Sequence, residues 1–277
     1  MHTFLWRPLV AGLVLLALTA PAGAIELKGR RVQGGLLTGR VTPGTMVAFQ
    51  DRPLRLSPDG LFVIGFDRDA PLESVLSLRA ADGRETRHPV RIAARTYDIQ
   101  RIDGLPQRKV TPPPEDLARI QREAALARTA RQRDDPRTDF AQAFIWPVHG
   151  RISGVYGSQR ILNGAPRQPH YGVDIAAPAG TPVKAPADGV VSLVHPDMFF
   201  SGRTLILDHG HGVSSTFLHL SAILVREGQA VRQGEVIARV GASGRVTGAH
   251  LDWRMNWFGQ RIDPTLLVPP MPAGKRP

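Results

Sequence analysis

The sequence contains no cysteine, and this absence excludes both a disulfide framework and any metal site with thiolate ligands. Aromatic residues are also scarce, at 6% of the chain, although 42% of its 277 residues are hydrophobic, which is enough to form a substantial core. The 24 acidic residues are outnumbered by 35 lysines and arginines, and the formal net charge is +11. This balance favours an anionic partner, such as nucleic acid, acidic lipid or a carboxylate-rich cell-wall polymer.

The apolar run at residues 9–18 is too short to cross a bilayer as a helix, which needs about 20 residues. Arg7 precedes this run, and Ala22-Gly23-Ala24 follows it with the small-x-small pattern of a cleavage site. We therefore predict that residues 1–24 are a signal peptide, and that the mature chain has no transmembrane segment. Export of the protein argues against nucleic acid as its partner.

Residues 25–110 have the pattern of a small β-sandwich-like domain. Short, partly alternating apolar segments are separated by turn sequences such as Pro58-Asp-Gly60 and Asp82-Gly83. The expected strands are Val32–Val41, Met46–Phe49, Leu61–Phe66 and Val75–Arg79. No catalytic pattern occurs in this domain.

Residues 111–136 are predicted to form a Pro-rich linker followed by a helix. Glu115 and Asp116 suit the positive N-terminal end of this helix, and Arg128 and Arg131 suit its negative C-terminal end. A thin apolar stripe predicts contact with a neighbouring domain, and it consists of Leu117, Ile120, Ala124 and Ala127.

Residues 144–268 are predicted to form a nearly all-β domain, and potential metal ligands are concentrated in it. His170 and Asp174 are four positions apart, which places both on one face of an extended strand. Gly172 and the β-branched Val173 favour a strand over a helix. The strand pattern is self-contained, so a chain that begins near Asp139 is expected to fold alone.

A second group of potential ligands follows in the same domain. His250 and Asp252 lie on one face if their segment is extended, with Leu251 on the other face, and His219 precedes them in Phe217-Leu-His219-Leu220. Nitrogen and oxygen donors of this kind are the ligands that zinc takes. The sequence therefore predicts a metal site.

These residues resemble the catalytic domain of the lysostaphin/LytM-type peptidoglycan endopeptidases, a family of zinc metallopeptidases. The family pattern is H-x-x-x-D, then a histidine in a (Y/F)-x-H-L segment, and then a closing H-x-H. Further similar segments are Gly154-Val-Tyr-Gly157, Ala177-Pro-Ala-Gly-Thr-Pro182, Val231–Ile237 and Gly241-Ala-Ser-Gly244. The resemblance covers roughly residues 144–265 and implies an antiparallel β-sheet domain of the LytM type.

The resemblance also implies a role for each candidate residue. His170, Asp174 and Asp252 would hold one Zn²⁺ per chain, and a water would complete the catalytic arrangement. His219 and His250 would then flank the open position, where one takes the proton of the water and the other stabilises the oxyanion. The sequence leaves open which histidine does which.

The closing triplet departs from the family pattern, because Asp252 stands where H-x-H has its second histidine. A carboxylate is an acceptable zinc ligand, but two negative charges should weaken the Lewis acidity of the metal. We expect an exported zinc endopeptidase of the Gram-negative periplasm that hydrolyses peptide cross-links of peptidoglycan. The alternative is a catalytically inactive LytM-type module that binds peptidoglycan or activates a partner amidase.

Two further sets of residues carry weaker patterns. Arg160 and Asn163 lie in or beside a predicted loop at residues 161–169 and are candidates for the substrate groove. His209-Gly-His211 is a literal H-x-H, but the adjacent glycines predict a hairpin turn whose side chains point outward. We therefore predict no metal at these two histidines.

Overall fold

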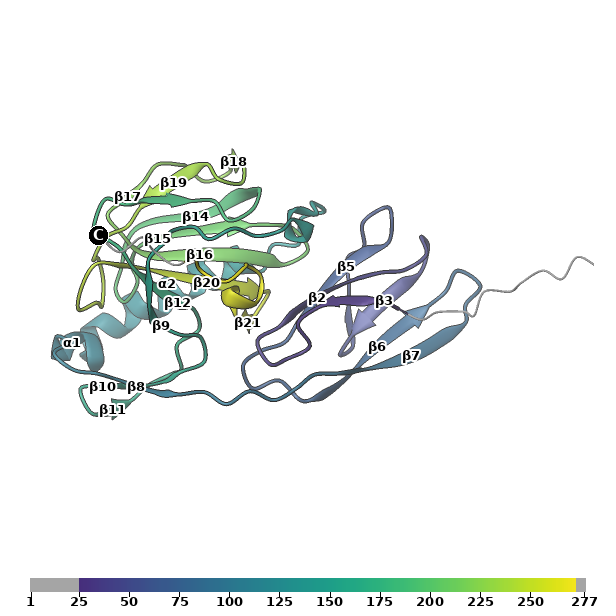
Figure 1. The fold of residues 1–277 in the computed structure, drawn as a ribbon, viewed down its shortest axis with the longest axis horizontal. Coiled ribbons are helices and arrows are strands. Elements are labelled where there is room, and N and C mark those ends of the chain that lie inside the picture. Colours follow the sequence, from purple (N-terminus) through teal and green to yellow (C-terminus); the bar gives the residue numbers. More distant parts are fainter. Residues whose placement is uncertain (1–24, 273–277) are drawn as a thin grey trace, which may run out of the picture.

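The computed structural model describes residues 25–272, so the predicted signal peptide lies outside the described residues. Figure 1 shows two lobes beside each other, joined by an extended segment that runs along one edge of the molecule. The architecture is mainly β with a C-terminal β-sheet domain, as the sequence predicts. No helix between residues 25 and 272 is long and apolar enough to span a bilayer.

The N-terminal lobe is built from two small antiparallel sheets. One has the strand order β1-β2-β5 and the other the order β4-β3-β6-β7. The strands are β1 (Leu27–Gly29), β2 (Leu36–Arg40), β3 (Met46–Phe49), β4 (Arg52–Pro53), β5 (Leu61–Gly65), β6 (Glu73–Arg79) and β7 (Glu85–Arg91). Their alternating apolar residues, among them Leu37, Phe49, Ile64 and Leu76, are buried in a common hydrophobic cluster. The first expected strand is shorter than predicted, because Gln33 and Gly34 form a turn before it.

The extended connection pairs with the C-terminal lobe before the linker helix begins. Strand β8 (Ile99–Ile102) runs parallel to β10 (Gln159–Leu162), which forms a hairpin with β11 (Ala165–Pro166). The sequence predicted a loop at residues 161–169, but part of this segment forms the β10–β11 hairpin. Asn163 and Gly164 both have positive φ, which is the geometry that an Asn-Gly hairpin turn requires.

The linker helix α2 (Pro114–Arg131) follows the short helix α1 (Gln107–Val110) and packs against β14 and β15. Proline at its first position and acidic residues in its first turn favour a helix start there. The predicted apolar stripe is only partly correct, because Leu117 is 46% exposed. Ala127 of the predicted stripe and Ala130 outside it make the hydrophobic contact with Leu193 and Ile206 of the sheet.

The C-terminal lobe is organised on one large sheet with the order β18-β14-β15-β16-β20-β12-β9, and β21 pairs with β20. A smaller sheet has the order β13-β19-β17. The strands are β9 (Arg151–Gly154), β12 (Val173–Ala176), β13 (Pro182–Lys184), β14 (Gly189–Met198), β15 (Gly202–Asp208), β16 (Val213–Leu220), β17 (Ala222–Ile223), β18 (Ala230–Val231), β19 (Val236–Arg239), β20 (His250–Trp257) and β21 (Gln260–Ile262). Two short 3-10 helices, Asp139–Ala141 and Pro264–Leu266, flank this sheet domain in the chain.

The two lobes meet through an apolar contact at the end of β20. Trp257 packs against Phe49 of the N-terminal lobe, with ring centroids 6.0 Å apart. Gly65 allows this close approach, since a Cβ atom there would lie 2.7 Å from Trp257 Cβ. Beside it, Arg95 forms an ion pair of 2.8 Å with the buried Asp263. One hydrophobic cluster therefore runs through both lobes.

Candidate active site

Adjacent strands β12 and β20 bring three potential ligands together. Asp174 lies directly opposite Asp252 in the antiparallel register, and His170 lies three residues before the first residue of β12. One donor atom from each of these residues lies within 4.8 Å of the other two. All three side chains are buried, and Asp252 is fully inaccessible. Two carboxylates facing each other across a strand pair repel, so this position requires a positive charge.

Several side-chain atoms that could bind a metal at this position have no hydrogen-bond partner within residues 25–272. His170 Nε2 lies 3.0 Å from Asp174 Oδ1, but without the geometry of a hydrogen bond. His170 Nδ1, His170 Nε2 and Asp174 Oδ1 are all buried and unbonded. A buried polar atom without a partner costs about 1–3 kcal/mol, so such atoms are rarely left without one. A neutral imidazole and carboxylate oxygens are suitable zinc ligands, and the residues present therefore fit a metal ion.

Each of the two carboxylates also has its own arginine. Arg160 Nη2 donates to Asp174 Oδ2 at 2.6 Å, and Arg254 Nη2 donates to Asp252 Oδ2 at 2.6 Å. Arg254 Nε additionally lies 3.0 Å from Asp252 Oδ1. Burial opposes ionisation of Asp252, but the charge of Arg254 outweighs it and lowers the pKa of this carboxyl. The pKa of Asp174 is also lowered, because His170 and Arg160 outweigh the effect of burial.

Two further histidines flank the three ligands, and main-chain carbonyls fix the tautomer of both. His219 Nδ1 lies 2.8 Å from the carbonyl of Ser243, and His250 Nδ1 lies 2.9 Å from that of Gly248. A carbonyl only accepts, so each Nδ1 carries a hydrogen and each Nε2 keeps its lone pair. His219 Nε2 lies 4.0 Å from Asp252 Oδ2, and His250 Nε2 lies 3.8 Å from Asp174 Oδ1. Burial lowers the pKa of His219 to about 4, which keeps its ring neutral at physiological pH.

Two glycines leave the space that this arrangement needs. A Cβ atom on Gly154 of β9 would lie 2.2 Å from Asp174 Oδ2, the oxygen that Arg160 binds. A Cβ atom on Gly172 would lie 2.6 Å from Asp252 Oδ1. Larger residues at either position would therefore displace one of the carboxylates.

A cleft of about 300 Å³ lies between α2 and the sheet, and His219 and Arg254 are part of its wall. Arg160, which the sequence assigned to the substrate groove, also lines it. Asn163 does not, because its amide group donates to Leu105 O at 2.8 Å and accepts from Leu105 N at 3.2 Å. Its side chain therefore fastens the β10–β11 turn to the connecting segment.

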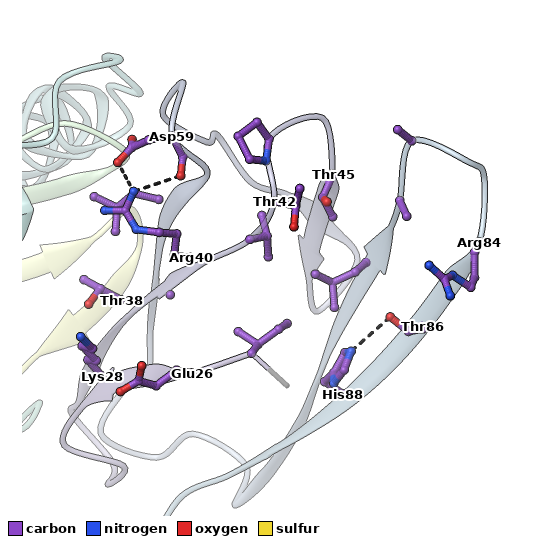
Figure 2. Close-up of a pocket in the computed structure, with 18 of the residues that line it drawn as sticks. Glu26, Lys28, Thr38, Arg40, Thr42, Thr45, Asp59, Arg84, Thr86 and His88 are labelled. Carbon is purple, nitrogen blue, oxygen red and sulfur yellow. Dashed lines mark hydrogen bonds and ion pairs between the residues drawn. The ribbon is translucent and has the colours of Figure 1, made fainter. Parts of the chain in front are cut away.

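A larger groove, of about 1070 Å³, lies in the N-terminal lobe, away from the histidines of the site. Figure 2 shows its wall, with Arg40 paired to Asp59 and His88 beside Thr86. The side chains of Arg40 and Asp59 are 57% and 62% exposed, so their charges are well solvated. The buried potential metal ligands, and His219 with its lowered pKa, lie instead beside the smaller cleft. We assign the active site to that cleft because of this chemistry.

The outward orientation predicted for the His209-Gly-His211 turn is wrong. His209 and His211 are only 0% and 3% exposed. His209 Nδ1 donates to Asp188 O at 2.7 Å, its Nε2 lies 2.8 Å from Ser215 Oγ, and His211 packs against Phe140. The turn folds inward because residues 135–140 cover it, and its histidines belong to the core rather than to a metal site.

Sequence reasoning missed Arg254, although the signal was present. It lies two residues after Asp252 on β20, so strand alternation puts both side chains on the face of His250. One histidine, two carboxylates and two flanking histidines on this face can bind a metal ion and activate a water molecule.

Comparison with known proteins agrees with this class of site. Residues 168–264 match the family described as Peptidase family M23. A crystal structure of a peptidase M23 from Pseudomonas aeruginosa is 33% identical to this chain, with a TM-score of 0.69. The similarity covers 86% of this chain and 95% of that one. The chain therefore belongs to peptidase family M23, and the resemblance to LytM and lysostaphin is confirmed.

Similar proteins that are named as peptidoglycan or DD-endopeptidases are longer than this chain. The DD-carboxypeptidase/endopeptidase Mpg of Neisseria meningitidis serogroup B is 39% identical over 125 residues, 45% of this chain and 29% of Mpg. The peptidoglycan DD-endopeptidase ShyA of Vibrio cholerae is 39% identical over 116 residues, 41% of this chain and 26% of ShyA. The chain thus matches less than a third of the length of these relatives.

Proposed function

We propose that this protein is a zinc-dependent endopeptidase that hydrolyses peptide cross-links of peptidoglycan in the periplasm. The observation that carries the proposal is the buried group His170, Asp174 and Asp252, whose donor atoms converge within 4.8 Å beside two histidines with fixed tautomers. Membership of family M23 and the peptidoglycan endopeptidases among its relatives support the choice of substrate. The predicted signal peptide and the net charge of +11 suit an exported protein that meets an anionic polymer.

His170, Asp174 and Asp252 would hold the zinc ion, which when bound polarises a carbonyl and lowers the pKa of its water to about 7. His219 and His250 approach this position with Nε2, the nitrogen that bears the lone pair. One of them can accept a proton from a water molecule at Nε2, and the other, after its Nε2 has taken a proton from solvent, can donate that hydrogen to an oxyanion. Their hydrogen bonds to Ser243 and Gly248 hold both rings in the orientation that these roles need.

Two arginines reduce the effect of the two carboxylates on the Lewis acidity of a bound metal. Arg160 and Arg254 each neutralise one of the aspartates, so the ligands with their counter-ions carry no net charge. A dication bound there would lose less Lewis acidity than it would beside two uncompensated carboxylates. The carboxylate oxygens have more than one lone pair, so each can accept from an arginine and still coordinate a metal.

The same two ion pairs favour a second candidate function. Because Arg160 and Arg254 already compensate both aspartates, the site is electrostatically satisfied without a metal. The protein would then be an inactive member of the family that binds peptidoglycan or activates a partner amidase. Metal content separates the two candidates.

Digestion of purified sacculi, with analysis of the released muropeptides, tests the proposed function. We expect cross-linked dimers to be converted to monomers, with one zinc per chain by elemental analysis and loss of activity on chelation. Asp252→Ala should lose metal and activity together, whereas Asp252→His should keep the metal. A zinc-free unaltered protein that leaves sacculi intact would favour the inactive module.

A further inference from the structure

The cleft between α2 and the sheet contains more positive charge than its surroundings compensate. Four arginines line it: Arg131 of α2, Arg160, Arg245 and Arg254. Three carboxylates lie in or behind its wall, and each already has an arginine. Arg160 pairs with Asp174, Arg254 with Asp252, and Arg119 with Glu123.

Arg131 and Arg245 are left without a carboxylate partner in the part of the chain that the structure describes. Arg245 is held by a hydrogen bond of 3.2 Å to Lys109 O, and its guanidinium lies 4.5 Å from the ring centroid of Phe200. Burial, together with repulsion from Arg160 and Arg254, lowers the pKa of Arg245 to about 10. Burial and neighbouring arginines likewise lower the pKa of Arg131 to about 9.

A polar atom in the wall also has no partner among residues 25–272. Thr216 lines the cleft and is only 3% exposed, yet its Oγ1 atom makes no hydrogen bond. Ile120, Ala124 and Leu218 supply apolar surface in the same wall. A cleft of about 300 Å³ that combines apolar side chains, an unbonded hydroxyl and two spare guanidinium groups suits a short acidic peptide.

We propose that this cleft is a subsite for a carboxylate-bearing part of the peptide substrate, with Arg131 and Arg245 as the groups that bind the carboxylate. The planar guanidinium binds a carboxylate through two parallel hydrogen bonds, which gives geometric selectivity in addition to charge. The subsite adjoins the candidate catalytic residues, since His219 and Arg254 line the same cleft. This inference rests on the proposed function, because it assigns a substrate feature to the same site.

A pair of synthetic muropeptide dimers tests the subsite, one with free carboxylates and one with the same carboxylates amidated. Binding of fluorescently labelled dimers is measured by polarisation on the zinc-loaded His250→Ala protein, in which turnover is suppressed. We expect the acidic dimer to bind roughly 10- to 100-fold more tightly, the value of one charged hydrogen-bonded pair. Arg131→Gln and Arg245→Gln, each in that background, should reduce this preference and leave the affinity for the amidated dimer unchanged.

Arg122→Gln is the matched control, because Arg122 is an exposed residue of α2 outside the cleft. It should keep the full preference, and Arg245→Lys should keep a part of it. Equal binding of the two dimers by the protein with all its arginines would overturn the proposal, as would an Arg122→Gln effect equal to that of Arg131→Gln. Binding does not require hydrolysis, so an inactive protein that prefers the acidic dimer would refute the proposed function and support the subsite.

Discussion

Removal of Arg254 should destabilise the metal-free protein much more than the zinc-loaded protein. Asp252 is fully buried opposite Asp174, and Arg254 donates its hydrogen bonds to it. Arg254→Ala leaves this carboxylate without compensation in the metal-free state. With zinc bound, the metal supplies the missing positive charge.

The size of the effect follows from the burial of the pair. Breaking a buried ion pair by removal of one partner costs about 3–5 kcal/mol, because the other charge remains desolvated. At roughly 2–4 °C per kcal/mol for a chain of this size, the melting temperature should fall by roughly 6–20 °C. In the zinc-loaded protein we expect less than half of this decrease. Zinc should also bind more tightly to Arg254→Ala, because a positive charge near the metal has been removed.

Thermal unfolding with chelator and with excess zinc measures both quantities. Arg91→Ala is the matched control, since Arg91 pairs with Glu73 on the surface and their side chains are 77% and 67% exposed. Such a pair contributes about 0–1 kcal/mol, with or without zinc. If Arg254→Ala melted in chelator within about 2 °C of the unaltered protein, Asp252 would not depend on Arg254 for its charge compensation.

Three further predictions concern the histidines and the linker. Alanine at His219 or His250 should reduce hydrolysis ~10²–10⁴-fold while zinc content stays near that of the unaltered protein; loss of zinc in both variants would show that they are ligands. Burial lowers the pKa of His209 from 6.5 to about 4, so the unfolded state binds the proton more readily and stability should decrease as the pH falls from 6.5 to 4. The decrease in the free energy of unfolding should approach about 3 kcal/mol below pH 4. Urea unfolding should show a flatter pH dependence for His209→Gln than for the unaltered protein. The same pH dependence in both proteins would contradict this assignment to His209. Removal of residues 1–138 should lower stability and expose apolar surface, detected by dye binding, because Trp257 and Ile206 lose their cover; an unchanged melting temperature would instead support a self-contained sheet domain.

The placement of the candidate ligands could be predicted because strand alternation is a local property. The positions of His250, Leu251 and Asp252 follow from the period of two, and Leu251 is indeed fully buried on the opposite face. Asp174 and Asp252 come together because β12 and β20 pair in register. Periodicity gives the face on which a residue lies, and the chemistry of that face indicated a metal.

The residues that pack over each face of the sheet come from distant parts of the chain, and the sequence did not predict which they are. Arg131 belongs to the linker helix, yet it lines the cleft beside His219. The inward position of His211 depends on its contact with Phe140, and the role of Asn163 depends on its hydrogen bonds to Leu105 of the connecting segment. Such contacts join residues far apart in sequence, so no local pattern predicts them.

The contact between Gly65 and Trp257 has a consequence for the order of folding. The N-terminal lobe is synthesised first, but the surface that it presents to Trp257 and Asp263 is completed only by the last strands of the chain. Until β20 and β21 form, Phe49 and its neighbours keep an exposed apolar edge, the kind of surface on which folding intermediates aggregate. We therefore expect the apolar contact between the lobes to form late, and a chain that stops before residue 257 lacks it.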